Sequence, residues 1–291
     1  MIRQAFSNYL SLIKFSHTVF ALPFALCGFV MGISEKHLPE NWPLLLIGVV
    51  LCMVFARSAA MAFNRYADYR IDALNARTAM REIPSGIIGP KRALFYVILN
   101  SALFCLCTYF INTLCFYLSP VALFVILGYS YTKRFTAWCH IVLGIGLALA
   151  PVGAYLAVTG EFALYPILLS IAVLTWTAGF DIIYALQDEA FDRNQNLRSI
   201  PVALGAKNAL RLSSFLHVVT AASIIFLGIV MHGGLLYWVG ASIFILMLIY
   251  QHLIVSPDDL SRINLAFGTT NGFASILFGM FFIAETLISF R

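Results

Sequence analysis

The chain has 291 residues, of which 61% are hydrophobic and 11% are charged, and its mean hydropathy is +0.90. An ordinary soluble domain has roughly 45–50% apolar and about 25% charged residues. This composition therefore excludes an ordinary soluble domain and indicates a protein that crosses a lipid bilayer several times. The net charge is +5, but the cations are spread over short connections between apolar stretches. We therefore expect no nucleic-acid partner.

Nine apolar stretches approach the length of about 20 residues that a helix needs to cross a bilayer. In chain order they cover residues 15–33, 42–63, 93–110, 113–131, 138–158, 164–180, 212–231, 235–255 and 265–289. No small-residue cleavage site follows the first stretch, so we expect a retained helix and not a signal peptide. The sequence therefore predicts an all-α, polytopic membrane protein with a single domain over residues 1–291.

The basic residues predict the orientation of these spans. If the N-terminus is cytoplasmic, fifteen of the eighteen Lys and Arg residues lie in cytoplasmic segments, and only Lys36 and Arg291 lie outside. Arg57 is the exception, because it lies within the second span. By the positive-inside rule, we expect the N-terminus and the connections after spans two and six to be cytoplasmic.

Those two connections hold seven of the thirteen acidic residues. The first contains NRYADYRID and the second YALQDEAFD, and arginines and then Ile-Pro follow each of them. They lie 120 residues and four spans apart, which places both on one side of the membrane and suggests a weak parallel duplication of a four-helix unit. The repeated positions are Asn64, Asp68 and Asp72 in the first motif and Tyr184, Asp188 and Asp192 in the second.

A spacing of four residues brings side chains to one face of a helix, so each motif is predicted to line one helix with oxygen ligands. Carboxylates at this spacing repel each other, and hard oxygen donors suit Mg²⁺, which is often shared with substrate phosphates. A single motif of this kind is typical of a solvated cap or a salt-bridged helix face, but two copies with the same flanks favour metal. The cations that could bind the phosphates are Arg70, Arg77, Arg81, Lys133, Arg134, Arg193 and Arg198.

These motifs resemble those of the UbiA family of intramembrane aromatic prenyltransferases, which are nine-helix enzymes with two aspartate-rich motifs. The continuations RTAMREIPSG and DRNQNLRSIPVALG, together with KFSHTVFALPFAL and YSYTKRFT, extend the resemblance over nearly the whole chain. The sequence most resembles the bacterial 4-hydroxybenzoate polyprenyltransferases. However, Arg65 stands where many members have aspartate, and this residue and the FDRxxxLxSIP ending resemble a branch proposed to prenylate a dihydroxynaphthoate in an alternative menaquinone route.

The resemblance implies a Mg²⁺-dependent enzyme of quinone biosynthesis with its helices around a central cavity. Such an enzyme transfers a polyprenyl group from polyprenyl diphosphate to an aromatic acid, either 4-hydroxybenzoate or a dihydroxynaphthoate. Metal and arginines stabilise charge on the departing diphosphate, and a dry cavity protects the allylic carbocation from water. The implied metal ligands are Asn64, Asp68, Asp72, Asp188 and Asp192.

Individual residues near the motifs have more than one interpretation. Arg57 lies on the helical face of the first motif and either orients the acceptor carboxylate or neutralises the aspartates. Asp181 and Tyr184 could orient substrate or accept the ring proton, and Asp181 could instead pair with an arginine. Lys133 and Arg134 fit a topology signal, although the resemblance favours Lys133 as a diphosphate contact. The six histidines, including His140, are expected to be structural.

Two other functional classes are compatible with the sequence. One is a different branch of the UbiA superfamily, with a haem, chlorophyll or lipid acceptor. The other is a secondary transporter, because intramembrane ionisable residues and internal repeats are normal in transporters. The acids argue against a transporter, since they cluster at one membrane face and not at the midplane.

Overall fold

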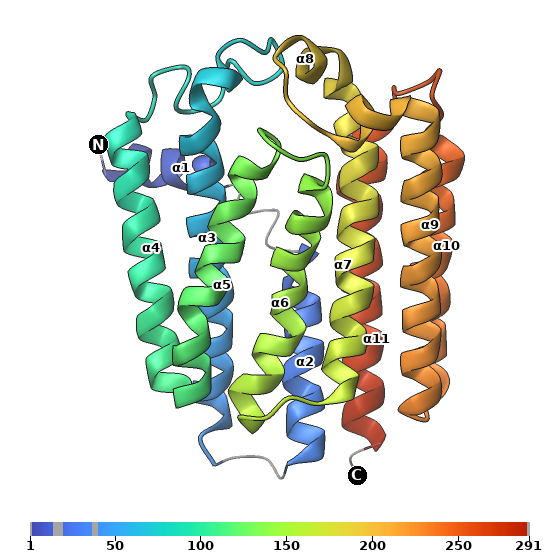
Figure 1. Ribbon diagram of the computed structural model, residues 1–291. Coiled ribbons are helices and arrows are strands. Elements are labelled where there is room, and N and C mark those ends of the chain that lie inside the picture. Colours follow the sequence, from blue (N-terminus) through green and yellow to red (C-terminus); the bar gives the residue numbers. More distant parts are fainter. Residues whose placement is uncertain (1, 14–19, 37–39, 290–291) are drawn as a thin grey trace. The chain divides into compact units, whose positions relative to one another are not determined.

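The computed structural model describes residues 2–13, 20–36 and 40–289, and this part of the chain is helical without a β-strand (Figure 1). The all-α prediction is confirmed for these residues. The long helices are α2 (Leu22–Glu35), α3 (Trp42–Asp72), α4 (Pro90–Ile111), α5 (Thr113–Thr132), α6 (Cys139–Thr159), α7 (Leu164–Ala185), α9 (Ile200–Val230), α10 (Leu235–Ile254) and α11 (Asn271–Ser289). The shorter elements are α1 (Ile2–Leu12), the 3₁₀ turn η2 (Leu186–Asp188), α8 (Glu189–Asn194) and the π-helical turn η3 (Leu265–Thr270).

Within the described residues, eight helical stretches are long and apolar enough to cross a membrane. They correspond to predicted spans two to nine, which supports an integral, multi-pass membrane protein. The first predicted span, 15–33, falls partly on residues 14–19, which lie outside the described residues. Its described part belongs to α2, an apolar helix of 14 residues, so the ninth crossing stays a prediction.

Several helix ends differ from the predicted spans because apolar length is not the same as helical length. Helix α3 continues nine residues past the predicted end at position 63 and reaches Asp72, since neither Gly nor Pro interrupts its polar end. Helix α9 begins at Ile200 with Ser199 as its N-cap, and Gly205 (φ +73°) kinks it before the predicted span starts. Helix α1 was not predicted.

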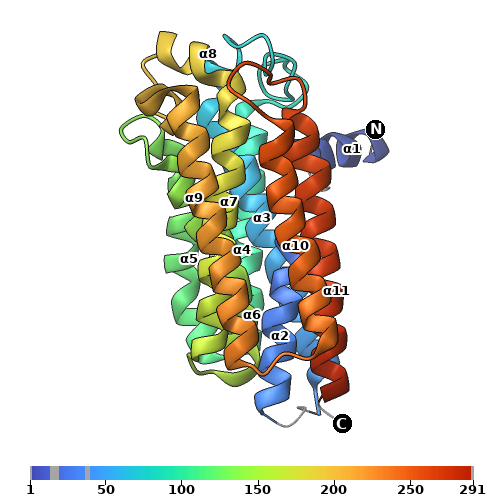
Figure 2. The same ribbon diagram turned by 90° about the vertical axis from the view of Figure 1, so that its right-hand side faces the viewer.

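One compact unit of the fold comprises residues 1–18 and 47–131. Its core includes Leu12, Ala62, Ile83 and Val97, and α1 runs crosswise to α3 and α4 (Figures 1 and 2). The connection between α4 and α5 is tight: Asn112 is the only residue between these helices, and its Oδ1 accepts the Cys115 N–H at 2.8 Å.

The second compact unit comprises residues 19–46 and 132–291. An aromatic cluster that includes Phe24, Trp176, Phe244 and Phe278 fills its core, and α9, α10 and α11 run side by side (Figure 2). Helices α2 and α6 touch through backbone, because a Cβ on Gly28 would lie 2.0 Å from the carbonyl oxygen of Pro151. Such close contacts through small residues are typical of membrane helices.

A candidate prenyl-transfer site

The first motif lies at the end of α3, as predicted, with all three oxygen-bearing residues on this one helix. Asp68 and Asp72 are only 2% and 5% exposed, while Asn64 is partly buried. Buried carboxylates are costly unless cations or hydrogen-bond donors compensate them. This end of α3 therefore requires positive charge close by.

Arg81 supplies part of that charge from the segment after α3. Its Nη1 lies 2.8 Å from both carboxylate oxygens of Asp72. Thr78 Oγ1 donates to the Asp72 carbonyl at 2.9 Å, and Ser11 Oγ of α1 donates to Glu82 Oε1 at 2.5 Å. The segment therefore folds back over the helix end that carries the aspartates.

Two further arginines of α3, the partly buried Arg57 and the buried Arg65, are incompletely paired. Nε of Arg57, and Nε and Nη1 of Arg65, are buried and have no hydrogen-bond partner among the described residues. Tyr129 of α5 lies within electrostatic range of both side chains.

The other two arginines near the first motif are exposed. Arg70 donates from Nε to the Tyr69 hydroxyl at 3.0 Å, and its guanidinium lies 5.7 Å from the centroid of that ring. The backbone N–H of Arg77 donates to Asn75 Oδ1 at 3.0 Å, which shapes the turn after α3.

The second motif is not on one helix, so that prediction is wrong. Tyr184 belongs to α7, Asp188 ends the 3₁₀ turn η2, and Asp192 lies in α8. A 3₁₀ turn has about 3.0 residues per turn, so the four-residue spacing no longer keeps the three side chains on one stripe. The Tyr184 ring is stacked on Phe267, with 4.1 Å between the centroids, and both aspartates are partly buried.

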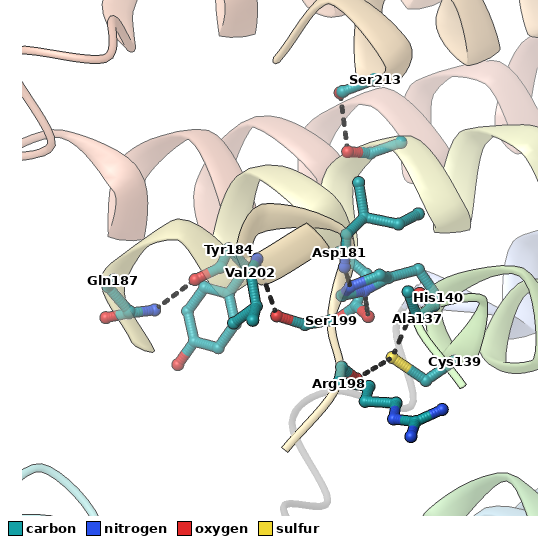
Figure 3. A network of polar contacts seen from close by, with 12 residues as sticks. Ala137, Cys139, His140, Asp181, Tyr184, Gln187, Arg198, Ser199, Val202 and Ser213 are labelled. Carbon is teal, nitrogen blue, oxygen red and sulfur yellow. Dashed lines mark hydrogen bonds and ion pairs between the residues drawn. The ribbon is translucent and has the colours of Figure 1, made fainter. Parts of the chain in front are cut away.

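Asp181 pairs with a histidine and not with an arginine. Nδ1 of His140, at the start of α6, lies 2.7 Å from Asp181 Oδ2 (Figure 3). The Ile200 N–H donates to His140 Nε2 at 3.4 Å. Because Nε2 accepts a hydrogen bond, Nδ1 carries the ring proton and donates a hydrogen bond to the Asp181 carboxylate. This contact ties together α6, α7 and the start of α9.

The cations on this second unit are distributed around the segment between α5 and α6. Arg198 donates from its backbone N–H to the Lys133 carbonyl at 2.7 Å and from Nη1 to the Phe135 carbonyl at 2.8 Å. The charge of Lys133 acts on Asp192. Arg193 pairs with Glu189 at 2.9 Å, and Arg134 is exposed.

Residues 21–283 match the UbiA prenyltransferase family. The chain belongs to this family. It is 30% identical over 252 residues to a 4-hydroxybenzoate octaprenyltransferase of Nitrosomonas europaea, a match that covers 85% of this chain and 84% of the relative. It is also 30% identical to the enzyme of the same name from Paraburkholderia phytofirmans, with 84% of each chain covered.

Solved UbiA homologues share the fold. The apo structure of a homologue from Aeropyrum pernix K1 has a TM-score of 0.80 and 29% identity, and the match covers 94% of this chain and 98% of that one. A homologue from Archaeoglobus fulgidus, bound to DMAPP and Mg²⁺, has a TM-score of 0.77 and 21% identity, with 97% and 99% covered.

The donor set of this UbiA-family chain suits Mg²⁺ chemically. Across the described residues, no three His, Cys, Asp or Glu side chains are close enough to hold a metal by themselves. Mg²⁺ keeps several waters and takes further ligands from substrate phosphates, so two carboxylates from a motif are a sufficient protein contribution. The buried pair Asp68 and Asp72 is of this kind.

The sequence reasoning missed two residues of the candidate site. The sequence singled out Arg65 only by its place in the first motif, and its burial with unpaired nitrogens is visible only in the structure. His140 was expected to be structural, and its contact with Asp181 spans 41 residues of sequence. No local pattern reveals such a contact.

Proposed function

We propose that this UbiA-family protein is a Mg²⁺-dependent aromatic prenyltransferase of quinone biosynthesis, built as one domain over residues 1–291. It transfers a polyprenyl group from polyprenyl diphosphate to an aromatic acid, with 4-hydroxybenzoate as the first candidate and a dihydroxynaphthoate as the second. The names of the bacterial relatives support the first acceptor. The departure at Arg65 favours testing the second.

The observation that carries this proposal is the buried end of α3. Two carboxylates, Asp68 and Asp72, lie there at the polar end of a membrane-length helix, and Arg57 and Arg65 of the same helix have unpaired guanidinium nitrogens. A soluble diphosphate head and a lipid-soluble tail require a site of this kind, with charge at the end of an apolar helix. A transporter site is typically nearer the midplane.

We assign the residues to metal binding, diphosphate binding and acceptor binding according to their chemistry. The aspartates of both motifs and Asn64 would hold Mg²⁺, which supplies charge stabilisation for the departing diphosphate. The cations Arg70, Arg77, Arg81, Lys133, Arg134, Arg193 and Arg198 bind diphosphate oxygens. Arg57 orients the acceptor carboxylate, and Asp181, held by His140, accepts the ring proton or orients the acceptor with Tyr184.

The proposed orientation places the N-terminus and both motifs on the cytoplasmic side. It is supported by the uneven distribution of Lys and Arg over the connections and by solubility, because both the diphosphate donor and an aromatic acid are charged. Apolar side chains along the helices exclude water from the developing carbocation.

Purified protein in nanodiscs tests the proposal. An allylic diphosphate is offered with a panel of aromatic acids, phenols and other UbiA-family acceptors, and products are identified by mass spectrometry. We expect a prenylated aromatic acid, dependence on Mg²⁺ and no product with excess EDTA. Asp68→Asn should abolish product formation in folded protein, whereas Asp259→Asn, at an exposed position outside the motifs, should retain it. Full turnover in EDTA would overturn the mechanism.

A further inference from the structure

Arg65 is buried with incomplete hydrogen bonding. It is 5% exposed, and its Nε and Nη1 have no hydrogen-bond partner in the described part of the chain. Other arginines near the first motif have clear partners: Arg81 contacts Asp72, and Arg70 donates to Tyr69. A charged group that is buried with unpaired hydrogen-bond donors destabilises the fold. Such an arrangement is expected where a ligand supplies the missing acceptors.

The charges around Arg65 leave capacity for an anion. Asp72 and Glu82 act favourably on its charge, and Arg81 acts unfavourably. Both acids already have other partners, since Asp72 accepts from Arg81 and Glu82 accepts from Ser11. Their negative charge is therefore shared, and the guanidinium is only partly compensated.

A second incompletely paired guanidinium lies on the same helix. Arg57 and Arg65 are eight residues apart on α3, a spacing that keeps both side chains near one face, and both act electrostatically on Tyr129 of α5. The buried Nε of Arg57 has no partner either. Two incompletely paired guanidinium groups near one helix face can together bind carboxylate or phosphate oxygens.

We propose that Arg65 binds a substrate oxyanion and, with Arg57, forms an anion-binding pair on the Tyr129 face of α3. The inference rests on the proposed function, because both substrates of that reaction carry such oxygens: the carboxylate of the aromatic acid and the diphosphate of the donor. Arg65 is thereby a substrate-binding residue.

Direct binding measurements test this without turnover. Wild type, Arg65→Met and the control Arg92→Met, at an exposed cation of the same unit, are titrated in nanodiscs by calorimetry. The two probes are 4-hydroxybenzoate and inorganic diphosphate with Mg²⁺. A charge-assisted hydrogen bond is worth about 1.5–3 kcal/mol, so Arg65→Met should weaken the binding of one probe about 10- to 100-fold. The control should stay within about twofold.

The probe that is affected identifies the anion. A weaker Kd for 4-hydroxybenzoate assigns Arg65 to the acceptor, and a weaker Kd for diphosphate assigns it to the donor. Unchanged Kd values for both probes, or no binding of either probe by wild type, would overturn the proposal. If wild type turns over and Arg65→Met binds both probes as wild type does, only this inference fails. If wild type binds the probes but shows no turnover, only the proposed function fails.

Folding is controlled by thermal melting and size-exclusion chromatography of each variant. Should Arg65→Met fail to fold, Arg65→Gln decides in the same way. Glutamine keeps a neutral hydrogen-bond donor near this position but carries no charge, so it removes the charge-assisted contact. An unchanged Kd in folded Arg65→Gln would contradict the assignment as firmly as in the methionine variant.

Discussion

The contact of His140 with Asp181 predicts different outcomes for two conservative substitutions. The asparagine amide nitrogen can occupy the position of Nδ1, which donates to Asp181 over 2.7 Å, while a glutamine amide reaches only the position of Nε2. His140→Asn should therefore keep the contact with Asp181, and His140→Gln should lose it. The Ile200 N–H, at 3.4 Å from Nε2, loses its acceptor in the first variant only.

The expected loss of turnover in His140→Gln can be estimated from the burial of the two side chains. The His140 side chain is 4% exposed and the Asp181 side chain 24% exposed, so water reaches the carboxylate but hardly the ring. A hydrogen bond to a charged group in such a site is worth about 1.5–3 kcal/mol. Because misplacing a catalytic group by about 1 Å can cost on the order of 100-fold in rate, we expect His140→Gln to lower kcat about 10- to 100-fold. The acceptor KM should change little.

The assay is single-acceptor turnover in nanodiscs, with free energies of unfolding measured on the same samples. Both variants are expected to lose some stability, since each leaves part of the His140 site unfilled, but only His140→Gln should lose turnover. In an Asp181→Asn background the glutamine substitution should have no further effect on kcat. Equal loss of turnover in the two single variants, or none in His140→Gln, would refute the positioning role.

Two further predictions concern binding and packing. Arg57→Ala should raise the acceptor KM by about 10-fold or more and remove the preference for an aromatic acid over the matching phenol; a variant that prefers the acid as strongly as wild type would show that the carboxylate binds elsewhere. Gly179→Ala should cost about 1–3 kcal/mol of unfolding free energy, because the new Cβ would lie 2.4 Å from the His217 ring. The control Gly153→Ala, with nothing within 4 Å of the added Cβ, should gain about 0.5–1 kcal/mol from helix propensity; equal stability of the two variants would contradict the packing argument.

The sequence predicted the helices well where composition and spacing act locally. Spans two to nine each correspond to a membrane-length helix, and the junction of α4 and α5 at Asn112 falls between the third and fourth predicted spans. The errors lie at helix ends. The polar end of α3 continues to Asp72, and the segment with Asp188 forms a 3₁₀ turn. Hydropathy could not predict either feature, because it carries no information on backbone hydrogen bonding.

The first motif could be predicted as one helical stripe because Asn64, Asp68 and Asp72 depend only on α3. Partner choice could not be predicted in the same way. The pairing of Arg81 with Asp72 needs the turn after α3, and the pairing of His140 with Asp181 needs two helices to align. Such contacts depend on tertiary packing, for which spacing within one segment carries no information.

Burial distinguishes arginines of α3 that need a binding partner from those that do not, which a count of charges cannot do. Arg57, Arg65 and Arg70 each add one positive charge to the same helix, but Arg70 is exposed and bound to its neighbour Tyr69, whereas the other two keep buried donors unpaired. An exposed arginine at a helix end costs almost nothing and is sufficiently explained by topology. A buried one must recover its desolvation free energy from some acceptor, and in the proposed reaction the oxygens of the two anionic substrates would be such acceptors. The cost of keeping Arg57 and Arg65 unpaired is therefore the physical reason to assign them to substrate binding ahead of the exposed cations around the motifs.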